Sequence, residues 1–128
     1  MKLKVLYWSS TALVAGVSLL AAVNYLLGTE QIVQAFAHLG YPPHLRVLLG
    51  VAKLLGAIAL LVPRFPRIKE WAYAGFTFAW ISAFVAHHVA QDGAEQFAPL
   101  VLLAVMGVSY ATRPGRLRLA AGDAAIHP

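Results

Sequence analysis

The sequence predicts an all-α fold: a four-transmembrane-helix bundle with a short interfacial amphipathic helix between spans one and two. Of its 128 residues, 60% are hydrophobic and only 12% are charged, whereas soluble domains are roughly 45–50% apolar and about 25% charged. A small chain has too much surface for its volume to hide so many apolar residues from water. The apolar residues also fall into four separate segments, and the positive charges lie at alternate ends of them. Lipid is therefore the expected solvent.

The four segments differ in how easily they would cross a bilayer. They are residues 5–27, 46–62, 71–90 and 97–111. Crossing the hydrocarbon takes roughly 17–25 helical residues, so the first and third segments qualify directly. The second and fourth are shorter and need flanking residues or a thin local bilayer. We expect residues 1–113 to form one membrane domain, followed by a loose tail over residues 114–128.

The distribution of basic residues decides between spans and buried core helices. With four spans, the N-terminus, the loop after span two and the C-terminus share one side, and the opposite loops carry only Arg46. The basic residues of the first side are Lys2, Lys4, Arg64, Arg67, Lys69, Arg113, Arg116 and Arg118. This asymmetry is the positive-inside pattern. It predicts a multi-pass protein of a cell inner membrane with cytoplasmic N- and C-termini, whereas cleavage of the first segment as a signal peptide would leave three spans and scatter the charges.

A short amphipathic helix is expected in the outer loop between spans one and two. Ile32, Val33, Phe36 and Leu39 recur at helical spacing, and polar residues occupy the opposite face. Thr29 is placed to cap the start of this helix and Gly40 to end it. Such a helix lies in the membrane interface, either as a lid-like connector or as a closure over a ligand cavity.

Aromatic side chains near the ends of the spans are expected to lie at the membrane interfaces, where amphipathic rings settle. They are Tyr7, Trp8, Tyr25, Trp71, Tyr73 and Tyr110.

Unusual polar residues gather in the outer half of the predicted bundle. They are Asn24 on span one, Lys53 on span two, and His87, His88 and Asp92 at the end of span three. A lysine near the centre of a membrane helix costs ~2.5–3.5 kcal/mol, so Lys53 must snorkel, pair or line a wet cavity. We interpret the set as a polar pocket open to the outer face, with Phe76, Trp80 and Phe84 as apolar walls. The alternative is that Lys53 snorkels and the histidines mark the headgroup boundary.

Several chemistries are not expected from this chain. It has no cysteine, which excludes disulfides, thiolate metal sites and iron–sulfur clusters. Adjacent His87 and His88 point about 100° apart on one helix, and that disfavours bis-histidine haem. A metal site from His38, His88 and Asp92 has no recognisable spacing, so none is predicted. The net charge of +5 is explained by topology, and no nucleic acid is expected as a partner.

Three blocks of the sequence are similar to the DoxX-like family of small four-helix membrane proteins. They are "FAHLGYP" at 36–42, "GVAKLLGAIALLVPRFPRIKEWAYAGFTF" at 50–78 and "VSYATRP" at 108–114. The resemblance implies a left-handed four-helix bundle in which Tyr41, Lys53, His87 and Asp92 occupy the family's characteristic positions. Members often carry an acidic or amide residue at position 79, where this chain has Ala79. The family is named for a membrane subunit associated with thiosulfate:quinone oxidoreduction, which makes quinone the ligand or cofactor that the analogy implies.

Three functions stay open at this point. The first is a ligand- or quinone-linked accessory subunit of a redox complex, whose candidate ligand-binding residues are Lys53, His87, His88, Asp92, Asn24, Trp80 and Tyr41. The second is a non-catalytic helper that docks onto a larger membrane partner through a stripe of small residues: Gly16, Gly50, Ala52, Gly56 and Ala57. The third is a small membrane enzyme that acts on a lipophilic substrate with Lys53, His87 and Asp92 as acid and base groups. The lipid bilayer is a partner in all three, and a redox protein or a second copy of the chain is compatible with them.

Overall fold

The all-α prediction is confirmed by a computed structural model that describes residues 2–119. These residues form five α-helices and two short 3₁₀-helices, with no strand among them. The first half of the chain holds α1 (Lys2–Leu27), α2 (Glu30–His38) and α3 (Pro43–Leu61). Gly28 and Gly40, with φ of +65° and +78°, end α1 and α2 because only glycine adopts such backbone angles readily.

The second half of the chain begins at a sharp reversal. Phe65 has a φ of 63° and precedes α4 (Pro66–Val89), whose first residue is a proline, as suits the first turn of a helix. A 3₁₀ turn, η1 (Gly93–Phe97), then leads directly into α5 (Ala98–Ala111).

Three helical segments in the described part of the chain are long and apolar enough to cross a membrane: α1, α3 and the continuous run Gly93–Ala111. Helix α4 has 24 residues, which span about 36 Å at a helical rise of about 1.5 Å. Its tryptophan, tyrosine and histidine side chains make it less apolar than the other three. The prediction of four spans therefore stays a prediction, although each predicted segment coincides with a helix.

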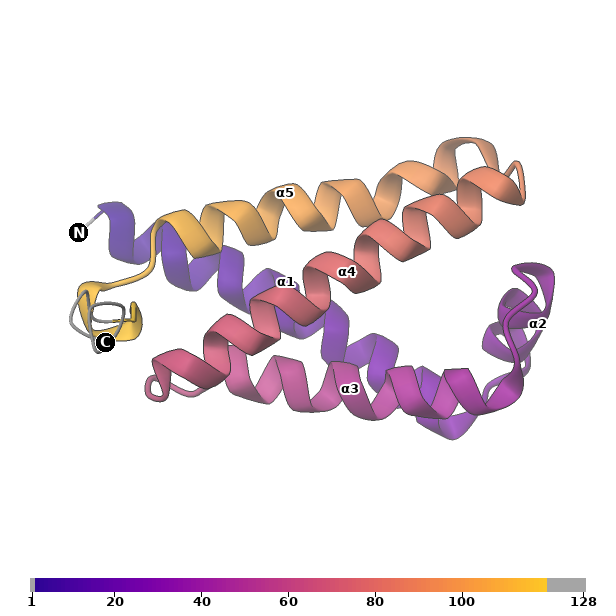
Figure 1. Cartoon of the computed structure of the whole chain (residues 1–128), viewed down its shortest axis with the longest axis horizontal. Coiled ribbons are helices and arrows are strands. Elements are labelled where there is room, and N and C mark those ends of the chain that lie inside the picture. Colours follow the sequence, from indigo (N-terminus) through magenta and orange to yellow (C-terminus); the bar gives the residue numbers. More distant parts are fainter. Residues whose placement is uncertain (1, 120–128) are drawn as a thin grey trace, which may run out of the picture.

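The four long helices pack in a ring (Figure 1), in which α1 contacts α3 and α5, and α4 contacts the same two helices. Successive long helices run in opposite directions, so the N-terminus and the α3–α4 turn lie at one end of the bundle. Helix α2 and the α4–α5 connection lie at the other end. This topology brings together the polar residues that the sequence placed in the outer half.

The core combines large side chains with a buried polar network. Val14, Leu60, Tyr73, Phe76, Trp80 and Met106 form one buried cluster. In the same region the Ser109 hydroxyl lies 2.6 Å from the Thr11 hydroxyl and 2.7 Å from the Tyr73 hydroxyl. These bonds satisfy polar groups that would be costly to bury alone.

The prediction that Tyr7 and Tyr73 lie at membrane interfaces is wrong. Their exposed fractions are 0% and 3%, because both rings fill the interior of the bundle and the Tyr73 hydroxyl has a buried partner. Trp71, by contrast, is 73% exposed. Many large aliphatic side chains also face outward, as expected for helices whose outer surface meets lipid.

The first part of the predicted loose tail is ordered. Residues Gly115–Leu117 form the turn η2, and Leu117 is buried. The Arg118 side chain donates hydrogen bonds to the carbonyls of Arg113 and Ala111, which fixes this turn against the end of α5. The rest of the predicted tail, residues 120–128, lies outside the described residues.

Lys69 has a structural role that the charge pattern did not show. It is fully buried, and its Nζ donates hydrogen bonds to the carbonyls of Ala59 and Leu60 at 2.7 and 2.9 Å. The last carbonyls of a helix have no partner within the helix, so the Lys69 ammonium closes the end of α3. It thereby joins α3 to α4 at the end of the bundle opposite α2.

Candidate ligand-binding site

Lys53 lies on α3 and points into the bundle. Its Nζ is 5.7 Å from the centroid of the Tyr25 ring and 5.9 Å from the centroid of the Trp80 ring, so the ammonium lies over two aromatic faces. Among the described residues no carboxylate forms a salt bridge with it. The charge is therefore stabilised by aromatic rings, and its hydrogen-bonding capacity is left for another group.

A cavity of about 530 Å³ surrounds this ammonium. Helix α2 and the turn after it cover the cavity at their end of the bundle, while α3 and α4 form its sides. The structure thus places Lys53 and His87, which come from different helices, in one hollow. Its aromatic and polar lining residues are Tyr25, Phe36, Tyr41, Lys53, Phe78, Trp80, Ser82 and His87.

Aromatic contacts hold the walls of the cavity in place. The Tyr25 and Phe36 rings meet edge to face with centroids 5.0 Å apart, and Phe36 and Tyr41 with centroids 5.8 Å apart. Trp80 stacks on Phe76 with centroids 5.1 Å apart. Since Phe36 is the buried residue of α2, the apolar face of this amphipathic helix packs onto the cavity rather than away from it. Thr29 occupies the N-cap position of α2 as expected, but its side chain makes no capping hydrogen bond.

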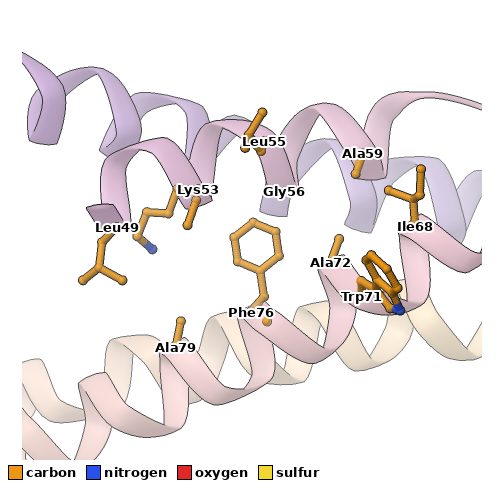
Figure 2. A pocket seen from close by; sticks show the side chains of 12 residues that line it. Leu49, Lys53, Leu55, Gly56, Ala59, Ile68, Trp71, Ala72, Phe76 and Ala79 are labelled. Atoms are coloured by element: carbon orange, nitrogen blue, oxygen red, sulfur yellow. The ribbon is translucent and has the colours of Figure 1, made fainter. Parts of the chain in front are cut away.

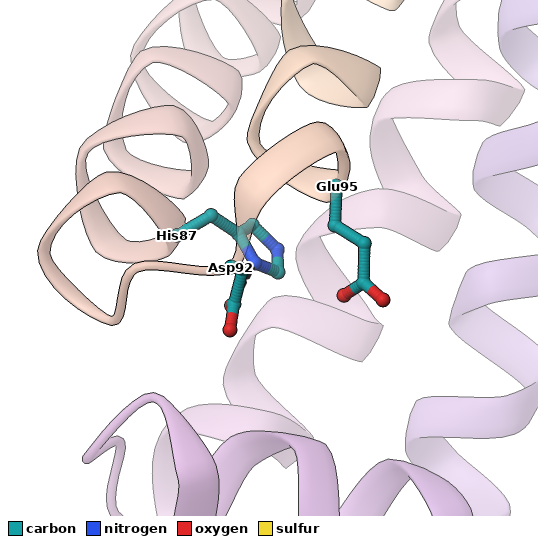
Figure 3. A group of neighbouring side chains, drawn as sticks. All are labelled: His87, Asp92 and Glu95. Atoms are coloured by element: carbon teal, nitrogen blue, oxygen red, sulfur yellow. Dashed lines mark hydrogen bonds and ion pairs between the residues drawn. The ribbon is translucent and has the colours of Figure 1, made fainter.

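His87 is oriented by a carboxylate from the α4–α5 connection (Figure 3). Asp92 Oδ2 lies 2.6 Å from His87 Nδ1, and Asp92 Oδ1 lies 2.5 Å from His38 Nε2 on α2. The hydrogen bonds from His38 and His87 lower the pKa of Asp92, and the bond to Asp92 raises the pKa of His38. An ionised carboxylate only accepts hydrogen bonds, so His87 Nδ1 carries the proton and Nε2 is left for a ligand.

A second, smaller hollow of about 310 Å³ continues from the cavity between α3 and α4 (Figure 2). Four residues line both spaces: Leu49, Lys53, Gly75 and Ala79. Its remaining lining is apolar and includes Gly56, with the Phe76 ring facing it across the gap. The cavity therefore has a polar chamber at Lys53 and an apolar groove that leaves it between two helices.

Two predicted site residues lie outside this arrangement. His88 Nδ1 is 2.9 Å from Gln96 Oε1, and its ring stacks on Phe84, so it faces away from the chamber. Asn24 donates to the carbonyl of Leu20 on its own helix. Asp92 does not line the cavity and reaches it only through His87.

Tyr25 and Phe36 line the cavity, although neither was predicted as a site residue from the sequence. Tyr25 was interpreted as an interfacial aromatic, and Phe36 as one of the apolar residues of a surface helix. The signal for Phe36 was present in the spacing of the apolar face of α2, but the surface that this face covers depends on how α2 folds back over α3 and α4. Ala79 lines both hollows. The position at which an acidic or amide residue was expected from the resemblance is therefore part of the site, and it carries an alanine here.

These features define a small helical membrane protein with an internal amphipathic cavity near one end of the bundle. The sequence matches the model of the DoxX-like family over residues 9–109, and the chain belongs to that family. Neither a curated protein nor a solved structure matches it.

Proposed function

We propose that this DoxX-like protein crosses the inner membrane four times, with cytoplasmic termini, and binds one quinone-like molecule in the Lys53 cavity. In this arrangement the α2 end of the bundle is the outer end. Helix α4 serves as the fourth span, because it is as long as a span and packs between α3 and α5. The observation that carries the proposal is the convergence of Lys53 and His87 on one cavity that continues into an apolar groove.

The polar chamber suits a headgroup that accepts hydrogen bonds. An ammonium carries three donors, and the structure gives Lys53 aromatic neighbours rather than a carboxylate. A quinone carbonyl accepts a hydrogen bond without bringing a full charge into the membrane. His87 lies on the same chamber, and an imidazole can exchange protons near neutral pH, which a quinone needs when it is reduced or oxidised.

The groove suits the apolar part of the same molecule. Its lining is almost entirely aliphatic and aromatic, and it joins the chamber at Lys53. An isoprenoid or alkyl tail placed there would lie between α3 and α4 and continue into the surrounding lipid. The ring of a quinone would then stack near Trp80, whose face is already oriented by Phe76.

The redox role that we propose is that of an accessory subunit. The chain has no cysteine, so thiol and iron–sulfur chemistry are not available to it. Electrons would pass between the bound quinone and a partner redox protein, while this chain holds the quinone and manages its protons.

The test is to purify the protein in mild detergent and measure what it retains. Native mass spectrometry, followed by solvent extraction and chromatography, should show one quinone or quinone-like lipid per chain. The Lys53→Met variant should bind a short-chain quinone roughly 10–100-fold more weakly, since a hydrogen bond to a charged group contributes about 1.5–3 kcal/mol. Quenching of tryptophan fluorescence by the added quinone gives the affinity.

Lys4→Met is the matched control, because Lys4 lies on α1 at the opposite end of the bundle. It should bind the quinone as the unmodified protein does. Lys53→Met should also raise the free energy of unfolding. A lysine within a membrane helix costs ~2.5–3.5 kcal/mol, and its contacts with the two aromatic rings offset only part of this cost. A Lys53→Met variant that is more stable and binds the quinone unchanged would refute the proposal.

The alternative of a docking helper loses much of its support, because the small residues proposed for docking are used inside the protein. A Cβ on Gly50 would lie 3.0 Å from Leu26 of α1, and a Cβ on Gly56 would lie 2.8 Å from Phe76 of α4. Ala57 is fully buried. Only Gly16 and Ala52 face outward, which is too little for a continuous helix-packing surface.

A further inference from the structure

We infer that His38, His87, Asp92 and Glu95 form a binding site for one divalent transition-metal ion at the α2 end of the bundle. These side chains come from three separate segments: the end of α2, the end of α4 and the α4–α5 connection. The sequence spacing does not suggest such a set, since the fold alone brings His38 next to Asp92.

The geometry brings the donor atoms of three of the four residues close together. One donor atom from each of His87, Asp92 and Glu95 lies within 4.8 Å of the other two, and Figure 3 shows all three side chains on the same side of the connection. His38 Nε2 lies 2.5 Å from Asp92 Oδ1 but outside this group of three, so its exposed ring would have to move to become a fourth ligand. Zinc binds nitrogen and oxygen ligands at roughly 2.0–2.2 Å in a tetrahedron, in which neighbouring ligand atoms are about 3.3 Å apart. The exposed Glu95 side chain can close the remaining distance by changing its rotamer.

The charges and the ligand types also fit a transition metal. Two carboxylates and two neutral imidazoles carry a net charge of −2, which balances a divalent cation. Within residues 2–119 neither acid forms a salt bridge with a lysine or arginine, although the chain is basic overall. Imidazole ligands favour zinc and related first-row ions over calcium and magnesium, which prefer oxygen ligands alone.

The two imidazole nitrogens that would bind the metal now face the Asp92 carboxylate. Their short contacts with Asp92 are hydrogen bonds, so a bound cation would replace the shared protons, as metal binding to such ligands requires. The metal would link α2 to the segment between α4 and α5. It would thereby hold α2, which covers the cavity, in place.

The site can be tested without any ligand in the cavity, so its failure would leave the proposed quinone site untouched. The full chain is purified with a tag that contains no histidine, stripped with a chelator and titrated with Zn²⁺ by calorimetry. We expect one ion per chain. Co²⁺ as a spectroscopic probe should give the intense visible absorption of a tetrahedral site.

Variants at the edge of the cluster make the test specific. Glu95→Gln and His38→Gln should each weaken Zn²⁺ binding by about tenfold or more, since even changes in the residues that support a metal's ligands cost roughly 10–100-fold. His88→Gln is the matched control, because His88 neighbours His87 in sequence but contacts Gln96 instead. Zn²⁺ should also raise the unfolding temperature of the unmodified protein and not that of Glu95→Gln.

Three results would overturn the site. They are the absence of saturable binding at one ion per chain, unchanged affinity in both Glu95→Gln and His38→Gln, or an equal loss in His88→Gln. Glu95 is exposed and lies outside the core, so its variant tests the site without disturbing the fold.

Discussion

Replacing Gly50 by alanine should push α1 and α3 apart. A Cβ on Gly50 would lie 3.0 Å from Leu26 Cγ and 3.1 Å from Tyr25 Cβ, whereas carbon atoms attract best at roughly 3.5–4.0 Å. Leu26 Cγ can move by a change of rotamer, but Tyr25 Cβ is bonded to the backbone of α1 and cannot rotate away. The contact can be relieved only by moving one helix against the other.

The expected size of the effect follows from two opposing terms. Overpacking of this kind lowers the free energy of unfolding by about 1–3 kcal/mol. Replacing a glycine in a helix interior by alanine raises it by roughly 0.5–1 kcal/mol. Gly16→Ala is the matched control, because a Cβ there would have no neighbour within 4 Å, so this variant should only gain stability. The difference between the two variants isolates the overpacking, at about 1–3 kcal/mol.

The assay is reversible unfolding in mixed micelles with increasing sodium dodecyl sulfate, followed by tryptophan fluorescence and by circular dichroism. Gly50→Ala should unfold at a lower detergent fraction than Gly16→Ala. Because Tyr25 lines the cavity, Gly50→Ala should also weaken quinone binding. If both variants gain stability by the same amount, α1 and α3 do not pack as closely as the structure describes, and the reasoning is refuted.

Two further predictions concern buried polar groups and use the same unfolding assay. Ser109→Ala leaves the hydroxyls of Thr11 and Tyr73 without their shared partner and should cost about 1–3 kcal/mol; a loss no greater than for a surface serine would show that the network is not formed. Lys69→Met removes the ammonium that closes the end of α3 and should lower stability by about 1–3 kcal/mol per unpaired carbonyl. Arg67→Met at the same turn should be nearly neutral, and equal effects of the two variants would contradict the capping role.

The helices were predictable because each depends on a local run of apolar residues. Glycine and proline also marked most of their ends, as at Gly28, Gly40 and Pro66. The boundary of α4 was placed at residue 71, but the helix begins at Pro66. Its first turn carries charges that look like a cytoplasmic loop in the sequence. One of them, Lys69, is buried because it faces carbonyls of α3, and no sequence pattern shows which carbonyls lack a partner.

The candidate site was predictable in its residue types and less so in its geometry. Lys53 stood out because a charged side chain within an apolar helix is energetically costly. In the structure its ammonium lies over two aromatic rings and lines the cavity. His87 and His88 could not be separated by composition, but on a helix they point about 100° apart, and only one of them can face the cavity. Glu95, which we propose as a metal ligand, could not be identified from the sequence, because the 3₁₀ turn η1 brings it close to Asp92.

The open side of the groove determines from where a molecule can arrive. Leu55, Ile68 and Trp71 line the groove and are 61%, 49% and 73% exposed, so in the proposed four-span arrangement this side of the site would face the acyl chains. A molecule dissolved in the bilayer would therefore enter by lateral diffusion, without passing through water. Its occupancy would follow its mole fraction among the lipids, and the aqueous concentration of so insoluble a compound would have no bearing on it.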